Sequence, residues 1–160
     1  MLEPEAGISR KPATLACLAR TRSAVLNVLV VVGAGIAASG WILGRHNPDA
    51  ALPWGLERTQ RALMGALMVL GVASYVLLRV GSGRDALRDP SRRAANFFKA
   101  RVGTASIAGL AIPLGFAYGW LIDPRLQALA PFWIAALGLG FLALPRGAEL
   151  DDFDEPMIEA

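Results

Sequence analysis

Side chains that commonly carry out catalysis or hold metals are scarce in this chain. Among 160 residues it has one cysteine, Cys17, and one histidine, His46. A single cysteine excludes a disulfide framework and a thiolate-built metal site, and a single imidazole excludes a centre that takes two histidines from one chain. The sequence also shows no nucleophile with a neighbouring base. We therefore predict that the protein is not an enzyme and that it holds no cofactor and no metal.

One motif, GAGIAA over residues 33–38, has the glycine spacing of a dinucleotide-binding turn. In such folds the glycines separate a strand from a helix, and an acid about 20 residues later ends a second strand. Here apolar residues continue without a turn to Leu43, and Asp49 and Glu57 lie in a proline-containing connection. No alternating strand and helix pattern follows. We interpret these glycines as places where helices pack against each other.

Four long apolar runs dominate the chain, which is 54% hydrophobic and 18% charged. Soluble domains average about 45–50% apolar and about 25% charged residues, whereas a helix needs about 20 apolar residues to cross a bilayer. The predicted membrane spans are 24–43, 62–80, 102–122 and 126–144. We predict an all-α polytopic membrane protein whose four transmembrane helices form an antiparallel bundle. Residues 126–144 could instead form a re-entrant or tilted segment, because their continuous apolar part is short.

Basic residues and tryptophans predict the orientation of these spans. Of 16 Lys and Arg residues, twelve lie in the arm 1–23, around the connection 81–101 or in the tail 145–160. Short basic flanks stay cytoplasmic, so both termini are predicted to be cytoplasmic, in a prokaryotic inner membrane to judge from the Ala-, Gly- and Arg-rich composition. A cleaved signal peptide at 24–43 is the less favoured alternative, because the run is long enough to span. The tryptophans all fall at the other interface, where they predict an aromatic belt of Trp41, Trp54, Trp120 and Trp133.

Small residues spaced four apart allow helix backbones to approach closely in lipid. The residues predicted to make such contacts, within the chain or between subunits, are Gly33, Gly35, Ala37, Ala111, Gly115 and Gly119. Pro113 removes a backbone donor in the third span and is expected to bend it.

The segments predicted to be cytoplasmic carry opposite charges. The residues predicted to dock a partner or anionic lipid are Arg84, Arg88, Arg92, Arg93, Lys99 and Arg101, together with Asp151, Asp152, Phe153 and Asp154 of the tail. Residues 91–101 are expected to form a short helix on the membrane surface. Alternatively, the arginines only enforce topology and the tail is solvated. No nucleic-acid partner is predicted, because no recognisable reading fold accompanies the charge.

The apolar runs contain no Asp, Glu, His or Lys, although ion-coupled transporters usually carry an ionisable group in the membrane. The sequence therefore favours an accessory, assembly or stabilising subunit of a larger membrane complex, with other integral membrane subunits and anionic lipids as partners. The alternative is a homo-oligomeric channel or carrier for a small neutral or anionic solute. That alternative requires Asn27, Ser74, Thr104 and Ser106 to converge on a cavity.

Overall fold

The computed structural model describes residues 12–45, 56–81, 83 and 90–146, and within these residues every regular element is a helix. The helices are α1 (Pro12–Leu43), α2 (Leu56–Gly81), α4 (Pro90–Gly109), α5 (Ala111–Leu121) and α6 (Leu126–Leu142). The predicted all-α fold class is confirmed for this part of the chain.

Three helical segments are long and apolar enough to cross a membrane. They are Leu15–Leu43, Glu57–Gly81 and the combined segment Arg92–Leu121. The fourth apolar helix, α6, has 17 residues, which is about 26 Å at 1.5 Å per residue and less than the roughly 30 Å of a hydrocarbon core. The three long helices are consistent with the predicted membrane location.

Two helices begin well before the apolar runs that predicted them. Helix α1 begins at Pro12 and α4 begins at Pro90, whereas the runs begin at residues 24 and 102. Proline is tolerated at the first helical position, and no proline interrupts residues 91–109. Residues 91–101 therefore form the first turns of the same helix that continues into the third apolar run. The prediction of a separate helix on the membrane surface is wrong.

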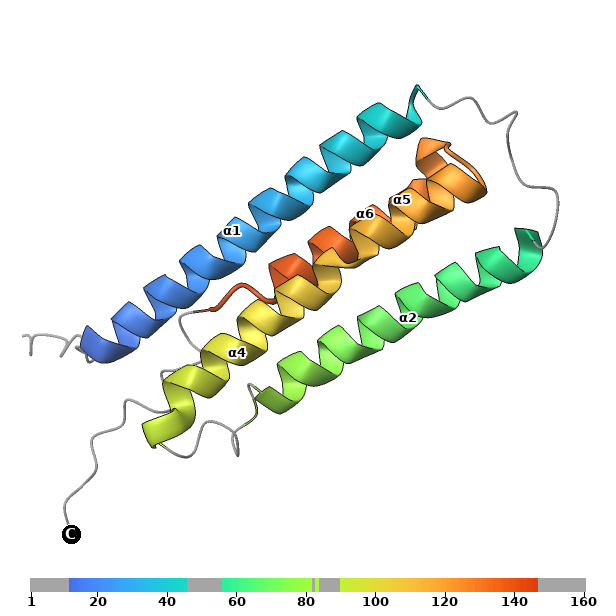
Figure 1. Ribbon diagram of the computed structural model, residues 1–160. Coiled ribbons are helices and arrows are strands. Elements are labelled where there is room, and N and C mark those ends of the chain that lie inside the picture. Colours follow the sequence, from blue (N-terminus) through green and yellow to red (C-terminus); the bar gives the residue numbers. More distant parts are fainter. Residues whose placement is uncertain (1–11, 46–55, 82, 84–89, 147–160) are drawn as a thin grey trace, which may run out of the picture.

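The helix of the third run is interrupted at Leu110, between α4 and α5. Pro113 has no N–H to bond the carbonyl of Gly109, and its ring crowds that carbonyl. Instead, the Leu110 N–H donates to the Ile107 carbonyl at 3.1 Å, one residue short of the α-helical spacing. Figure 1 shows α5 continuing the line of α4, so the chain passes the proline with a local break and no turn.

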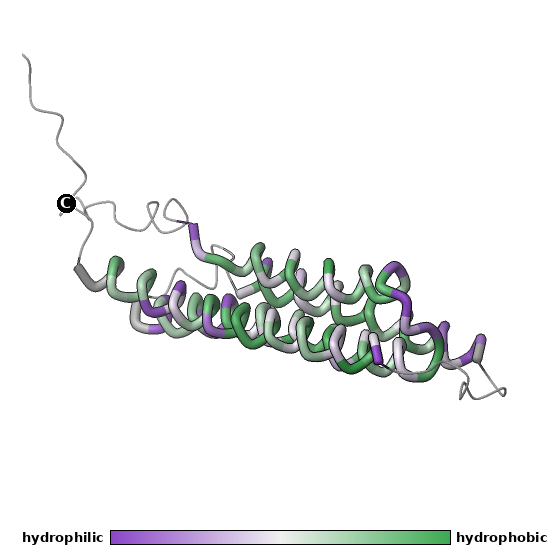
Figure 2. The backbone as a smooth tube through the Cα atoms, turned by 90° about the horizontal axis from the view of Figure 1, so that it is seen from above, coloured by the Kyte–Doolittle hydropathy of each residue, from purple (hydrophilic) through white to green (hydrophobic). Residues whose placement is uncertain are grey.

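The α4–α5 segment lies between α1 and α2, and α6 packs against it (Figure 1). Three buried clusters follow one another along the helices, and each joins α1, α6 and either α4 or α5. They comprise Val25, Leu29, Ala105 and Ala143; then Val32, Ala111, Ile112 and Ala136; then Leu43, Tyr118, Leu129 and Phe132. Helix α2 adds only partly buried residues to these clusters. Figure 2 shows polar residues gathered toward the two ends of the helices, with apolar residues between them.

Candidate functional site

The described cations and acids are unevenly distributed along the helices. The start of α1, the end of α2, the start of α4 and the end of α6 lie toward one end of the molecule (Figure 1), here called the basic end. Its described cations are Arg20, Arg22, Arg79, Arg92, Arg93, Lys99, Arg101 and Arg146. The acids that the structure describes, Glu57 and Asp123, lie at the start of α2 and in the α5–α6 turn. Positive charge therefore accumulates at the basic end without a described carboxylate beside it.

The opposite end contains cations and acids together. Arg61 Nη2 lies 3.2 Å from Glu57 Oε2, and Arg125 Nε lies 3.8 Å from Asp123 Oδ1. These pairs are exposed and contribute little to stability. Each pair places a cation beside an acid at this end.

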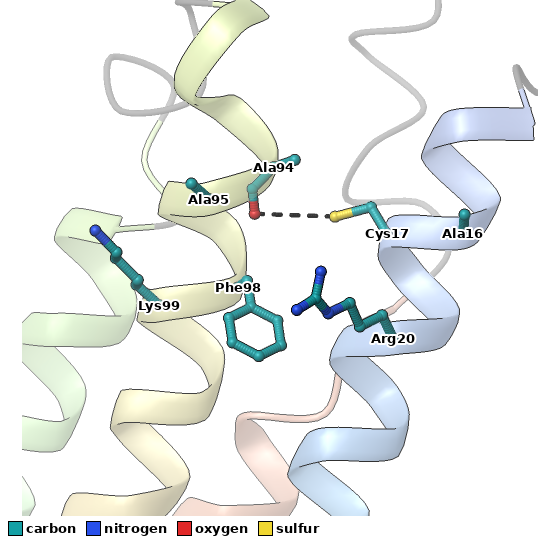
Figure 3. Close-up of a pocket in the computed structure, with 7 residues that line it drawn as sticks. All are labelled: Ala16, Cys17, Arg20, Ala94, Ala95, Phe98 and Lys99. Atoms are coloured by element: carbon teal, nitrogen blue, oxygen red, sulfur yellow. Dashed lines mark hydrogen bonds between the residues drawn. The ribbon is translucent and has the colours of Figure 1, made fainter.

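A hollow of about 510 Å³ opens between α1 and α4 at the basic end, and we call it the α1–α4 hollow. It is lined by Ala16, Cys17, Arg20, Ala94, Ala95, Phe98 and Lys99 (Figure 3). The Cys17 Sγ lies 3.9 Å from the Ala94 carbonyl oxygen, a weak contact between the two helices. The Arg20 guanidinium carbon lies 5.4 Å from the centre of the Phe98 ring, within the range of a cation–π interaction.

Arg101 does not lie on the surface where it was predicted to dock a partner. Its side chain is 4% exposed, and its Nη1 donates a hydrogen bond of 3.2 Å to the Leu142 carbonyl at the end of α6. A cation is favourable beside the carbonyls that end a helix. The prediction of Arg101 as a docking residue is wrong, because its face of α4 is turned toward α6. Arg101 instead ties the end of α6 to α4.

The other predicted docking residues fall into two groups. Arg92 and Lys99 are exposed on α4, and Arg93 is half-buried. The remaining ones lie outside the described residues: Arg84, Arg88, Asp151, Asp152, Phe153 and Asp154.

The residues predicted to pack helices together occupy two different environments. A Cβ on Gly115 would lie 2.8 Å from Phe132 Cβ, and one on Gly119 would lie 2.5 Å from Leu43 Cδ1. These two backbones therefore approach side chains of α6 and α1 at distances that only glycine permits. Ala111 is also buried, and a Cβ on Gly35 would meet the Ile112 side chain at 3.1 Å.

Gly33 and Ala37 lie on the exposed face of α1. Nothing lies within 4 Å of a Cβ built on Gly33, so this pair takes no part in packing within the chain. Gly81 of α2 also meets Ala100 of α4, a contact that the sequence did not predict. Gly81 lies at a helix end and is not part of a series of small residues spaced four apart.

The predicted aromatic belt is split between the surface and the interior. Trp41 is 64% exposed and Trp120 is 46% exposed, and both lie near the helix ends opposite the basic end (Figure 1). Trp133 is half-buried and packs beside the clusters that contain Ile112 and Phe132. Trp54 lies outside the described residues.

The neutral polar residues of the apolar runs do not converge on one cavity within the chain. Ser74 and Thr104 are buried together, and the Thr104 hydroxyl donates to the Ser74 carbonyl at 3.4 Å. Asn27 and Ser106 are exposed. In the part of the chain that the structure describes, no group of three or more His, Cys, Asp or Glu side chains could hold a metal ion.

Comparison of the chain with known proteins found no matching family model, no matching curated protein and no matching solved structure.

Proposed function

We propose that this protein is a non-catalytic accessory or assembly subunit of a larger complex in a prokaryotic inner membrane. In this proposal all four apolar segments cross the bilayer as an antiparallel bundle, α6 included, and both termini are cytoplasmic. The basic end then lies at the cytoplasmic surface, as basic flanks do. Its partners are other integral membrane subunits.

The observation that carries the proposal is the outer surface of α2. Only 6% of its most apolar window is buried inside the chain, against 44% for the α4–α5 segment. One face of α2, here called the α2 outer strip, carries large apolar side chains that are each at least 49% exposed: Met68, Val69, Val72, Val76 and Val80. Because α2 contributes so little to the interior of its own chain, its exposed apolar face is available to pack against another subunit.

A glycine near the strip strengthens this argument. Gly65 is exposed, and nothing lies within 4 Å of a Cβ built on it. Glycine inside a helix costs about 0.5–1 kcal/mol relative to alanine, and no contact among the described residues requires that cost at Gly65. Glycine at this position would allow the helix of another subunit to approach α2 closely.

The test is purification in a mild detergent from cells that express the tagged protein at its native level. We expect other membrane subunits to co-purify in a fixed ratio. The double substitution Gly65→Trp and Val72→Trp should release them, because two indoles on an exposed face hinder a partner without disturbing the chain's own core. Ile134→Trp on α6 is the matched control, since Ile134 is 69% exposed and lies outside the strip.

Two outcomes contradict the proposal. One is recovery of the wild-type chain with no other subunit. The other is a symmetric oligomer of this chain alone that passes solute across liposomes, which would support the alternative of a channel or carrier. No contact within the described chain favours that alternative.

A further inference from the structure

The α1–α4 hollow lies where two helices change from charged to apolar. In α1, Arg20 and Arg22 precede a run without charge that begins at Ala24. In α4, Lys99 and Arg101 precede a run without charge that begins at Val102. Arg20 and Phe98 therefore each stand four residues before an apolar run, about 6 Å along the helix axis. In a membrane this level corresponds to the lipid headgroups.

The hollow combines a cation with apolar walls. Ala16, Ala94 and Ala95 line it with small side chains, and Phe98 adds an aromatic face. Figure 3 shows the Arg20 guanidinium extending from α1 toward Phe98 of α4. The Arg20 guanidinium carbon lies 5.4 Å from the centre of that ring, and the N–H groups of a guanidinium can bind two oxygens of one phosphate.

Lys99 also lines the hollow and adds positive charge to it. Its amine points away from Arg20 in Figure 3, so Arg20 is the cation directed into the space between the helices. Both side chains are exposed, and the acids that the structure describes lie toward the opposite end of the helices. No described carboxylate therefore competes with an anionic ligand for the cations of this hollow.

We propose that the α1–α4 hollow binds the phosphate headgroup of an anionic phospholipid, with Arg20 as its principal ligand. The phosphate lies against Arg20, and the glycerol and upper acyl chain follow the alanine and Phe98 walls toward the bilayer. Lys99 contributes by its charge and not by direct contact. The proposal does not depend on a partner subunit, so it can fail or succeed independently of the function proposed above.

Cys17 gives a direct readout, because it is the only cysteine of the chain and it lines the hollow. The full chain is placed in nanodiscs of phosphatidylcholine alone or with one part in three of phosphatidylglycerol, and the rate of Cys17 alkylation by N-ethylmaleimide is measured. We expect alkylation to be at least about threefold slower with phosphatidylglycerol, the protection given by a site that is two-thirds occupied. Arg20→Gln should abolish most of this difference, and Lys99→Gln should reduce it less.

Arg22→Gln is the matched control. It removes the same charge from an exposed position of α1 that does not line the hollow, so it reports the effect of surface potential on the thiol. An unchanged elution volume in phosphatidylcholine discs confirms that each variant is folded. The proposal is overturned if the wild-type protein is alkylated at the same rate in both kinds of disc. It is also overturned if Arg20→Gln and Arg22→Gln reduce the difference between the two discs equally.

Two further outcomes would assign the hollow to another occupant. In phosphatidylcholine discs, faster Cys17 alkylation after Asp151, Asp152 and Asp154 are changed to Asn would identify the chain's own tail as the occupant. Protection in those discs that appears only on addition of inorganic phosphate would identify a site for the free anion. Either result overturns the lipid assignment.

Discussion

Helix α2 and the α4–α5 segment are both apolar enough to cross a membrane, but they occupy different places in the molecule. The segment α4–α5 lies at the centre and contacts all the other helices, whereas α2 lies at the edge and packs mainly on α4. The most apolar window of α2 has the higher mean hydropathy, 2.0 against 1.4, and yet the lower buried fraction. In hydrocarbon, apolar character does not drive a helix inward, because lipid tails are as apolar as leucine.

Side-chain size accounts for the difference better than hydropathy does. Gly115 and Gly119 of α5 let that helix approach Phe132, Leu43 and Leu129 closely. In α2, nothing lies within 4 Å of a Cβ built on Gly65 or Gly71, and the glycine that does meet a neighbour, Gly81, lies at the helix end. Close packing by van der Waals contact favours the helix whose small residues match the large residues of its neighbours.

The largest effect is expected from removing a large side chain at the centre. Phe132→Ala should lower the free energy of unfolding by about 3 kcal/mol, because Phe132 is fully buried and its loss leaves a cavity beside Gly115. The measurement is denaturant unfolding in detergent micelles. Phe141→Ala on the same helix is the control, since Phe141 is 58% exposed. Equal destabilisation by both substitutions would contradict the central place of α5 and α6.

A smaller effect is expected from adding bulk where the two helices differ. Gly119→Leu should destabilise the fold by about 1–3 kcal/mol, because the new side chain must displace Leu43 and Leu129. Gly65→Leu in α2 should leave the isolated chain's stability unchanged or raise it slightly, since nothing lies near the new Cβ. The same unfolding measurement compares the two variants. If Gly65→Leu destabilises the isolated chain as much as Gly119→Leu does, the contrast between the helices is wrong.

The smallest of the three effects is expected at the basic end. Arg101→Gln should cost about 1–2 kcal/mol, because the Leu142 carbonyl loses a charged donor and the cation beside the end of α6 is removed. Hydrogen exchange of the last turn of α6 should accelerate in this variant. Arg92→Gln, at an exposed position of α4, should change neither quantity. Unchanged exchange in Arg101→Gln would show that Arg101 does not hold α6.

The helical class and the approximate position of each apolar helix could be predicted from the sequence. The helix starts could not, because a run of apolar residues marks only the part of a helix that lies in hydrocarbon. The first turns of α4 are polar and those of α1 are interrupted by Arg20 and Arg22, so neither segment continues the apolar run that follows it. An effect of Pro113 on the third helix was predictable, since the missing N–H acts within the helix itself, but the sequence predicted a bend and the structure has a break at Leu110 with α5 continuing the line of α4.

The candidate site was only partly predictable. Positive charge between the second and third runs was evident, but the sequence could not distinguish Lys99, which is exposed, from Arg101, which is buried. The sequence also did not predict that residues near Cys17 lie beside residues near Phe98, because these residues belong to helices far apart in the chain. The α1–α4 hollow forms only because α1 and α4 lie side by side.

The sequence alone determined that this chain forms long apolar helices with charged residues at their ends, because backbone groups in hydrocarbon must bond within the helix and charges must stay near water. Only the tertiary structure decided which helix lies at the centre, which glycines meet a neighbour and which arginine is buried. These choices depend on how side chains of different size fit together across helices. Such complementarity is a property of pairs of surfaces, and it cannot be read from one helix alone.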